Sequence, residues 1–203
     1  MFSSIQQALE QVQELRTRIL DNRLFKGYSA RARLGGASAA LLGTLLLASG
    51  IVPQTVAAHT IAWGSVCVIA AVLNYGALVR WYREQPEQKR EMAMLRPAID
   101  ALPALSVAAL LTWAIYARQQ HDMLFGTWMV MFGLMHTSSR HSLPQKIWWL
   151  GWYYIACGVW YFVLLDVQNF YNPWPMGIVF TVGECAGAWV LRKHRESGVL
   201  VEG

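Results

Sequence analysis

Residues 34–79, LGGASAALLGTLLLASGIVPQTVAAHTIAWGSVCVIAAVLNYGALV, decide the fold, because this long run contains no Asp, Glu, Lys or Arg. A helix that crosses the hydrocarbon core of a membrane needs about 20 predominantly apolar residues. The run is long enough for two such helices, and Pro53 and Gln54 mark the point where it divides. It therefore predicts a pair of membrane-spanning helices joined by a short turn.

The rest of the chain repeats this pattern. Further apolar blocks cover residues 101–117, 123–139, 147–165 and 167–191, and Glu184 is the only charged residue within them. Unpaired backbone cannot lie in lipid, and the blocks lack the alternating polarity of barrel strands. The sequence predicts an all-α bundle of six transmembrane helices over residues 34–191, arranged as three hairpins. Residues 1–33 and 192–203 flank it as a cytoplasmic segment and a short cytoplasmic tail.

Composition and charge agree with this class of protein. Hydrophobic residues make up 55% of the chain and charged residues 14%, whereas a soluble domain has about 25% charged residues. The formal net charge is +5, and Arg118 is the one basic residue on the side of the short turns. The others flank the opposite ends of the blocks: Arg16, Arg18, Arg23, Lys26, Arg31, Arg33, Arg80, Arg83, Lys89, Arg90, Arg96, Arg140, Lys146, Arg192, Lys193 and Arg195. This asymmetry predicts cytoplasmic termini in a bacterial-type inner membrane, and it does not suggest nucleic-acid binding.

Residues 3–24 have the pattern of an amphipathic helix rather than a span. Apolar side chains recur at three- and four-residue steps, at Ile5, Ala8, Val12, Leu15 and Ile19. Such a helix is expected to lie on the cytoplasmic surface of the membrane. The alternative is a short helix–helix contact with a second copy of the chain or with a partner.

No pattern of an enzyme or of a bound cofactor is present. The three cysteines, Cys67, Cys157 and Cys185, all fall within apolar blocks, so they are expected to be packing residues rather than a disulfide framework. His136 and His141 are five residues apart, which separates them around a helix and makes a poor metal pair. We therefore expect no catalytic residues, no metal and no cofactor.

Small residues mark the faces where helices can come close together. Gly183 and Gly187 are four residues apart, as are Gly36 and Ala40. This spacing favours close packing in lipid, between helices of one chain, of two copies or of a partner membrane protein. Aromatic residues near the block ends, Trp63 among them, are predicted to form belts at the membrane surfaces.

Three strongly polar side chains fall within the apolar blocks. Asn74, His136 and Glu184 each lie in the half of a span nearer the basic side. A carboxylate in mid-membrane costs roughly 2.5 to 3.5 kcal/mol, so Glu184 is expected to face the bundle. We predict a buried polar cluster in which Glu184 is protonated or is paired with His136 or Asn74.

Two functions fit this cluster. In the first, a small transporter or channel-like protein moves protons, a cation or a small solute past Glu184, with His136 as a relay. It predicts water access to Glu184, and Thr181, one turn away, could extend the path. In the second, a non-catalytic scaffold or accessory subunit binds partner helices, and the polar residues are static hydrogen-bonding groups. It predicts a closed bundle with Glu184 fully paired.

Overall fold

The computed structural model describes residues 6, 11–12, 29–87, 95–138, 145–164 and 169–199, and these residues are helical apart from short connections. The predicted helix at residues 3–24 lies almost entirely outside the described residues. The six long helices are α2 (Ala30–Ala48), α3 (Val56–Glu84), α4 (Arg96–Ala117), α5 (Leu124–Ser138), α6 (Gln145–Val163) and α7 (Trp174–Val199), and a 3-10 turn, η3 (His121–Met123), precedes α5. The described part of the chain contains no strand, so the all-α prediction is confirmed.

Three of the six helices are long and apolar enough to cross a membrane. The segments are Val56–Glu84, Ala98–Ala117 and Trp174–Lys193, in α3, α4 and α7. Each of the other three helices has a feature that lowers its length or its apolarity. Helix α2 carries two arginines in its first turn, α5 covers 15 described residues, and α6 is rich in Trp and Tyr. The fold is therefore compatible with a membrane protein, and length and composition support three of the six predicted spans.

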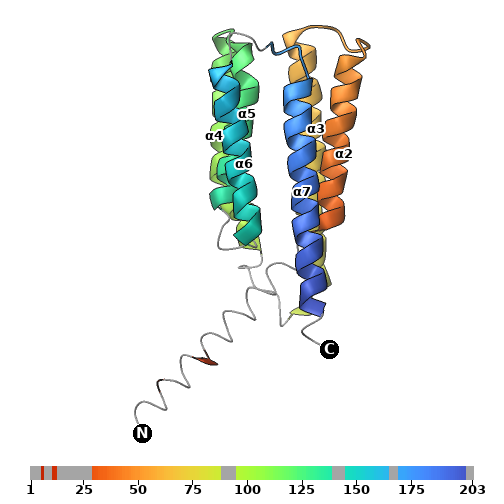
Figure 1. Cartoon of the computed structure of the whole chain (residues 1–203), viewed down its shortest axis with the longest axis vertical. Helices are drawn as coiled ribbons and strands as arrows, with labels where there is room; N and C mark the ends of the chain where they lie inside the picture. Colours follow the sequence, from red (N-terminus) through yellow and green to blue (C-terminus); the bar gives the residue numbers. More distant parts are fainter. Residues whose placement is uncertain are drawn as a thin grey trace.

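The helices form two groups of three (Figure 1). In the first, α2 packs against both α3 and α7; in the second, α5 packs against both α4 and α6. We call them the α2/α3/α7 group and the α4/α5/α6 group. The predicted hairpins α2–α3 and α4–α5 pack as pairs. The third one differs, because α7 packs mainly against α2 and makes a smaller contact with α6. The last two helices thus join the two groups.

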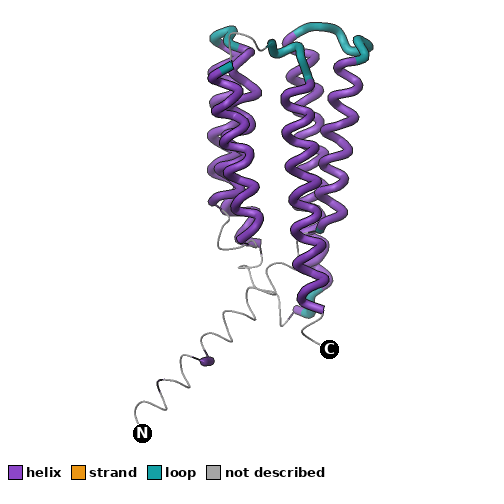
Figure 2. The backbone as a smooth tube through the Cα atoms, in the orientation of Figure 1, coloured by secondary structure: helices purple, strands orange, loops and turns teal. Residues whose placement is uncertain are grey.

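The connections α2–α3 and α4–α5 and the described part of the connection α6–α7 lie at one end of the molecule (Figure 2). We call it the turn end, and the opposite end, where α2 begins and α7 finishes, the terminal end. Gly50 follows the last residues of α2 with a φ of 75°, a conformation that favours glycine just beyond a helix. The Thr55 side chain then caps α3 by accepting a hydrogen bond from Ala58 N at 3.3 Å.

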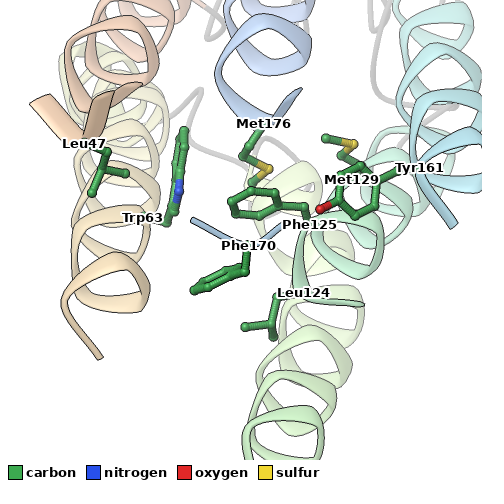
Figure 3. Close-up of a cluster of buried hydrophobic side chains, with 8 residues drawn as sticks. All are labelled: Leu47, Trp63, Leu124, Phe125, Met129, Tyr161, Phe170 and Met176. Atoms are coloured by element: carbon green, nitrogen blue, oxygen red, sulfur yellow. The ribbon is translucent and has the colours of Figure 1, made fainter. Parts of the chain in front are cut away.

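An aromatic core fills the interface between the two groups at the turn end (Figure 3). Phe125 and Phe170 lie at its centre with ring centroids 4.9 Å apart. Asp122 Oδ1 accepts a hydrogen bond from Phe170 N at 2.8 Å, which ties the α6–α7 connection to the start of α5. Trp63 is buried here, so its assignment to a belt at the membrane surface is wrong. The buried residues of this aromatic core are Leu47, Trp63, Leu124, Phe125, Met129, Tyr161, Phe170 and Met176.

Within the α4/α5/α6 group, α5 and α6 approach through glycines. Gly126 of α5 faces Gly158 of α6, and Gly133 of α5 faces Gly151 of α6. The two glycines within each helix are seven residues apart in the sequence. A Cβ atom at Gly133 would lie 2.6 Å from Gly151 O, and one at Gly158 would lie 2.8 Å from Gly126 O. Backbone atoms cannot move away as a side chain can. These glycines therefore set how closely the two helices pack.

Candidate functional site

Glu184 lies on α7 and is buried, with 5% of its surface exposed. Its Oε1 atom forms an ion pair with Arg33 Nη1 at 3.2 Å. The hydroxyl of Tyr154, from α6, donates a hydrogen bond to the same oxygen at 3.4 Å. The predicted inward orientation of Glu184 agrees with this position, but its charged partner is Arg33 rather than His136 or Asn74.

Arg33 is the central residue of the site. It lies in the first turn of α2, and only 4% of its surface is exposed. A second guanidinium nitrogen, Nη2, lies 2.8 Å from His136 Nε2. Arg33 therefore joins the two residues that the sequence predicted to meet. We call Arg33, His136, Tyr154 and Glu184 the Arg33 cluster.

A signal for Arg33 is present in the sequence. The buried residues of α2 include Arg33, Gly36, Ala37, Ala40 and Thr44, which recur at three- and four-residue steps. Arg33 thus continues the buried small-residue face of α2 by one turn. The sequence places Arg33 among the basic residues of the predicted cytoplasmic segment, and its burial was therefore not predicted.

The contacts of His136 fix its hydrogen-bonding state. An arginine side chain has donors only, so His136 Nε2 must be the acceptor of the bond with Arg33. His136 Nδ1 lies 3.0 Å from Phe132 O, which can only accept, so Nδ1 carries the proton. His136 is therefore neutral, and its one acceptor nitrogen is occupied by Arg33. A relay role would require this contact to break.

Asn74, the third predicted residue, lies beside the Arg33 cluster. Its amide nitrogen donates to Ala70 O of its own helix at 2.9 Å. A Cβ atom at Gly36 would lie 3.5 Å from Glu184 Oε2 and 3.8 Å from Asn74 Nδ2. Glu184 and Asn74 are therefore both neighbours of Gly36, and the structure brings all three predicted polar residues into one region.

The predicted packing residues Gly183 and Gly187 make room for the two partners of Glu184. A Cβ atom at Gly183 would collide with the hydroxyl and ring of Tyr154, and one at Gly187 would collide with the guanidinium of Arg33. Gly36 and Ala40 lie on the buried face of α2. The two glycines of α7 thus admit polar side chains rather than the backbone of another helix, and the sequence did not predict this use.

The charges of the Arg33 cluster are divided unequally between the two helix groups. Arg33 and Glu184 both belong to the α2/α3/α7 group, so the ion pair lies within one group. Across the interface, Arg33 meets the neutral His136 of α5, and Glu184 meets the hydroxyl of Tyr154 of α6. Within the Arg33 cluster, a separation of the groups would break these two hydrogen bonds and leave the ion pair intact.

Several buried polar side-chain atoms have no hydrogen-bond partner among the described residues. In the Arg33 cluster this atom is Arg33 Nε, and on α7 it is Thr181 Oγ1. At the turn end, Trp63 Nε1, Tyr161 Oη and both ring nitrogens of His59 are further examples. Buried donors and acceptors are normally paired with protein or water, so each of these atoms can accept a water molecule or another polar group as its partner.

Within the described residues, no group of three His, Cys, Asp or Glu side chains could hold a metal ion. The fold and the site define an all-helical protein with three candidate spans and a buried ion pair that lies within one of two helix groups. No family model, no curated protein and no solved structure matches this chain.

Proposed function

We propose that the chain is a small transporter of a bacterial-type inner membrane, with six spanning helices and cytoplasmic termini. The basic residues of the sequence gather at the ends of the apolar blocks that correspond to the terminal end, which supports this orientation. Exposed apolar side chains along α3 and α4, such as Val68, Val72 and Leu110, support contact with lipid.

The single observation that carries the transport proposal is the division of charge in the Arg33 cluster. Transporters commonly bind their substrates between two bundles that rock against each other near the middle of the membrane. A charge left unpaired by such a motion would be strongly unfavourable. Because Arg33 and Glu184 stay paired within one group, separation of the groups would cost the Arg33 cluster only its contacts with two neutral residues, His136 and Tyr154.

Apolar contacts close this interface on both sides of the Arg33 cluster. The aromatic core lies on the side of the turn end. Toward the terminal end, buried Ile147 of α6 and Leu191 of α7 pack together with Ala30 of α2. This arrangement fits a closed state of a transporter, from which one side at a time would open toward water.

A non-catalytic scaffold or accessory subunit is the second candidate. It is favoured by the burial of Glu184 and by its two partners, Arg33 and Tyr154, because a static role needs a fully paired carboxylate. In this function the Arg33 cluster only fastens the two helix groups together. The small-residue and apolar faces of the helices would then contact a second copy or a partner membrane protein.

Flux measurements on the full chain in liposomes separate the two candidates. We expect the wild-type protein to move protons, followed with a trapped pH dye, or one of a panel of small ions and solutes. Glu184→Gln should lower that flux at least tenfold, because the neutral amide weakens the contact with Arg33. Glu84→Gln is the matched control, since Glu84 forms an exposed ion pair with Arg80 on α3, and its flux should equal that of the wild type.

Two results would contradict this proposal: the first contradicts the role of Glu184, and the second contradicts transport itself. Unchanged flux in Glu184→Gln would remove this carboxylate from the mechanism. No flux of any probe in the wild-type protein, together with loss of stability in Glu184→Ala, would favour the scaffold.

A further inference from the structure

We propose that the Arg33 cluster binds a small monocarboxylate between the two helix groups, with the carboxylate on the Nε and Nη2 edge of Arg33. This inference rests on the transport function proposed above and names its substrate class. In this structure, Nη2 at one end of that edge is bonded to His136.

The three guanidinium nitrogens of Arg33 have different surroundings. Nη1 is paired with Glu184 Oε1 at 3.2 Å, and Nη2 is bonded to His136 Nε2 at 2.8 Å. Nε is buried and has no partner among the described residues. Because Nε and Nη2 point their hydrogens in the same direction, they form one edge that can hold two acceptors. Nη2 already has one acceptor, His136, and Nε has none among the described residues.

A carboxylate matches this edge better than His136 does. Its two oxygens accept from two parallel N–H groups at once, whereas the imidazole offers a single acceptor. His136 is neutral in its contact with Arg33, so a charged acceptor would replace a weaker one. The carboxylate would also pair the Nε donor that the protein itself leaves unpaired.

The neighbouring residues limit the charge and size of the ligand. Glu184 already supplies one negative charge on the other side of the guanidinium, which disfavours a doubly charged phosphate. The aromatic rings of Phe132 and Tyr154 flank His136, with centroids 4.6 Å and 5.6 Å from its ring. These rings suit a short, largely apolar chain attached to the carboxylate. We infer a monoanion of a few carbon atoms.

Binding of acetate and lactate to the purified full chain in nanodiscs tests this inference. The matched probes are acetamide and lactamide, which keep the shape but lack the charge. We expect saturable binding of the carboxylates by calorimetry and at least tenfold weaker binding of the amides. Arg33→Lys keeps the charge but loses the planar fork, and it should weaken acetate binding at least tenfold. Arg80→Lys, on the exposed face of α3, should bind as the wild type does.

A second variant, His136→Phe, tests the same site if Arg33→Lys fails to fold. This variant removes the acceptor that is bonded to Arg33 Nη2, so acetate should bind more tightly than to the wild type. Equal binding of acetate and acetamide, or weaker acetate binding in a folded His136→Phe variant, would overturn the proposal. Acetate binding without any flux would support this site and contradict transport. Flux of another solute without carboxylate binding would support transport and overturn this substrate class.

Discussion

Replacing Arg33 by Met is expected to lower the free energy of unfolding by about 3 to 5 kcal/mol, because it leaves a buried charge without its partner. Among the described residues, Glu184 would keep only the hydrogen bond from the Tyr154 hydroxyl, and His136 would lose the donor for its Nε2 atom. A denaturant titration in detergent micelles, followed by far-UV circular dichroism, measures this loss.

Two further variants show whether the loss comes from the ion pair. Arg80→Met removes an arginine from an exposed ion pair with Glu84 and should leave stability nearly unchanged. The double variant Arg33→Met with Glu184→Leu should recover most of the stability, since neither charge then remains buried. Equal losses in Arg33→Met and Arg80→Met would show that Arg33 does not pair with Glu184 inside the protein.

Replacing Gly133 by Val is expected to have the second largest effect, a loss of about 3 kcal/mol, at the upper end for an overpacked interior. A Cβ atom there would lie 2.6 Å from Gly151 O and 2.9 Å from Ile155 N, both backbone atoms of α6. Since backbone atoms of a helix cannot turn aside, α5 and α6 must move apart. The same denaturant titration measures the loss.

Gly76 on α3 provides a matched control for this prediction. A Cβ atom at Gly76 meets no atom within 4 Å, so Gly76→Val changes the helix propensity without creating a clash. If the two valine variants lose the same stability, the close approach of α5 and α6 does not stabilise the fold.

The helices themselves could be predicted well from the sequence. Residues 34–79 form two helices with a turn that includes Pro53 and Gln54, and the block at residues 123–139 corresponds closely to α5 (Leu124–Ser138). Long stretches without charge leave the chain few alternatives to helices. The pairing of α7 with α2 could not be predicted, because apolarity shows that a helix is buried or in lipid but does not identify its neighbour.

The candidate site could be predicted only in part. Glu184 and His136 were recognisable because polar residues are rare within apolar blocks, and both are buried. Arg33 was missed because each apolar block begins after the last charged residue. Arg33 directly precedes the first block, so it was counted with the cytoplasmic segment although it is buried. Tyr154 was missed because tyrosines are ordinary in such a chain, and its contact with Glu184 depends on how α6 lies against α7.

The central claim is that the interface around the Arg33 cluster opens to water, and the reactivity of a cysteine at position 181 tests it most directly. Thr181 lies one turn from Glu184, and its Oγ1 atom is buried without a partner among the described residues. In a background with the three native cysteines replaced by serine, Thr181→Cys is treated with a charged, membrane-impermeant thiol reagent. We predict that Thr181→Cys reacts, while Ile178→Cys, on the exposed apolar face of α7, does not. A Thr181→Cys protein that is folded and stays unreactive would contradict the account.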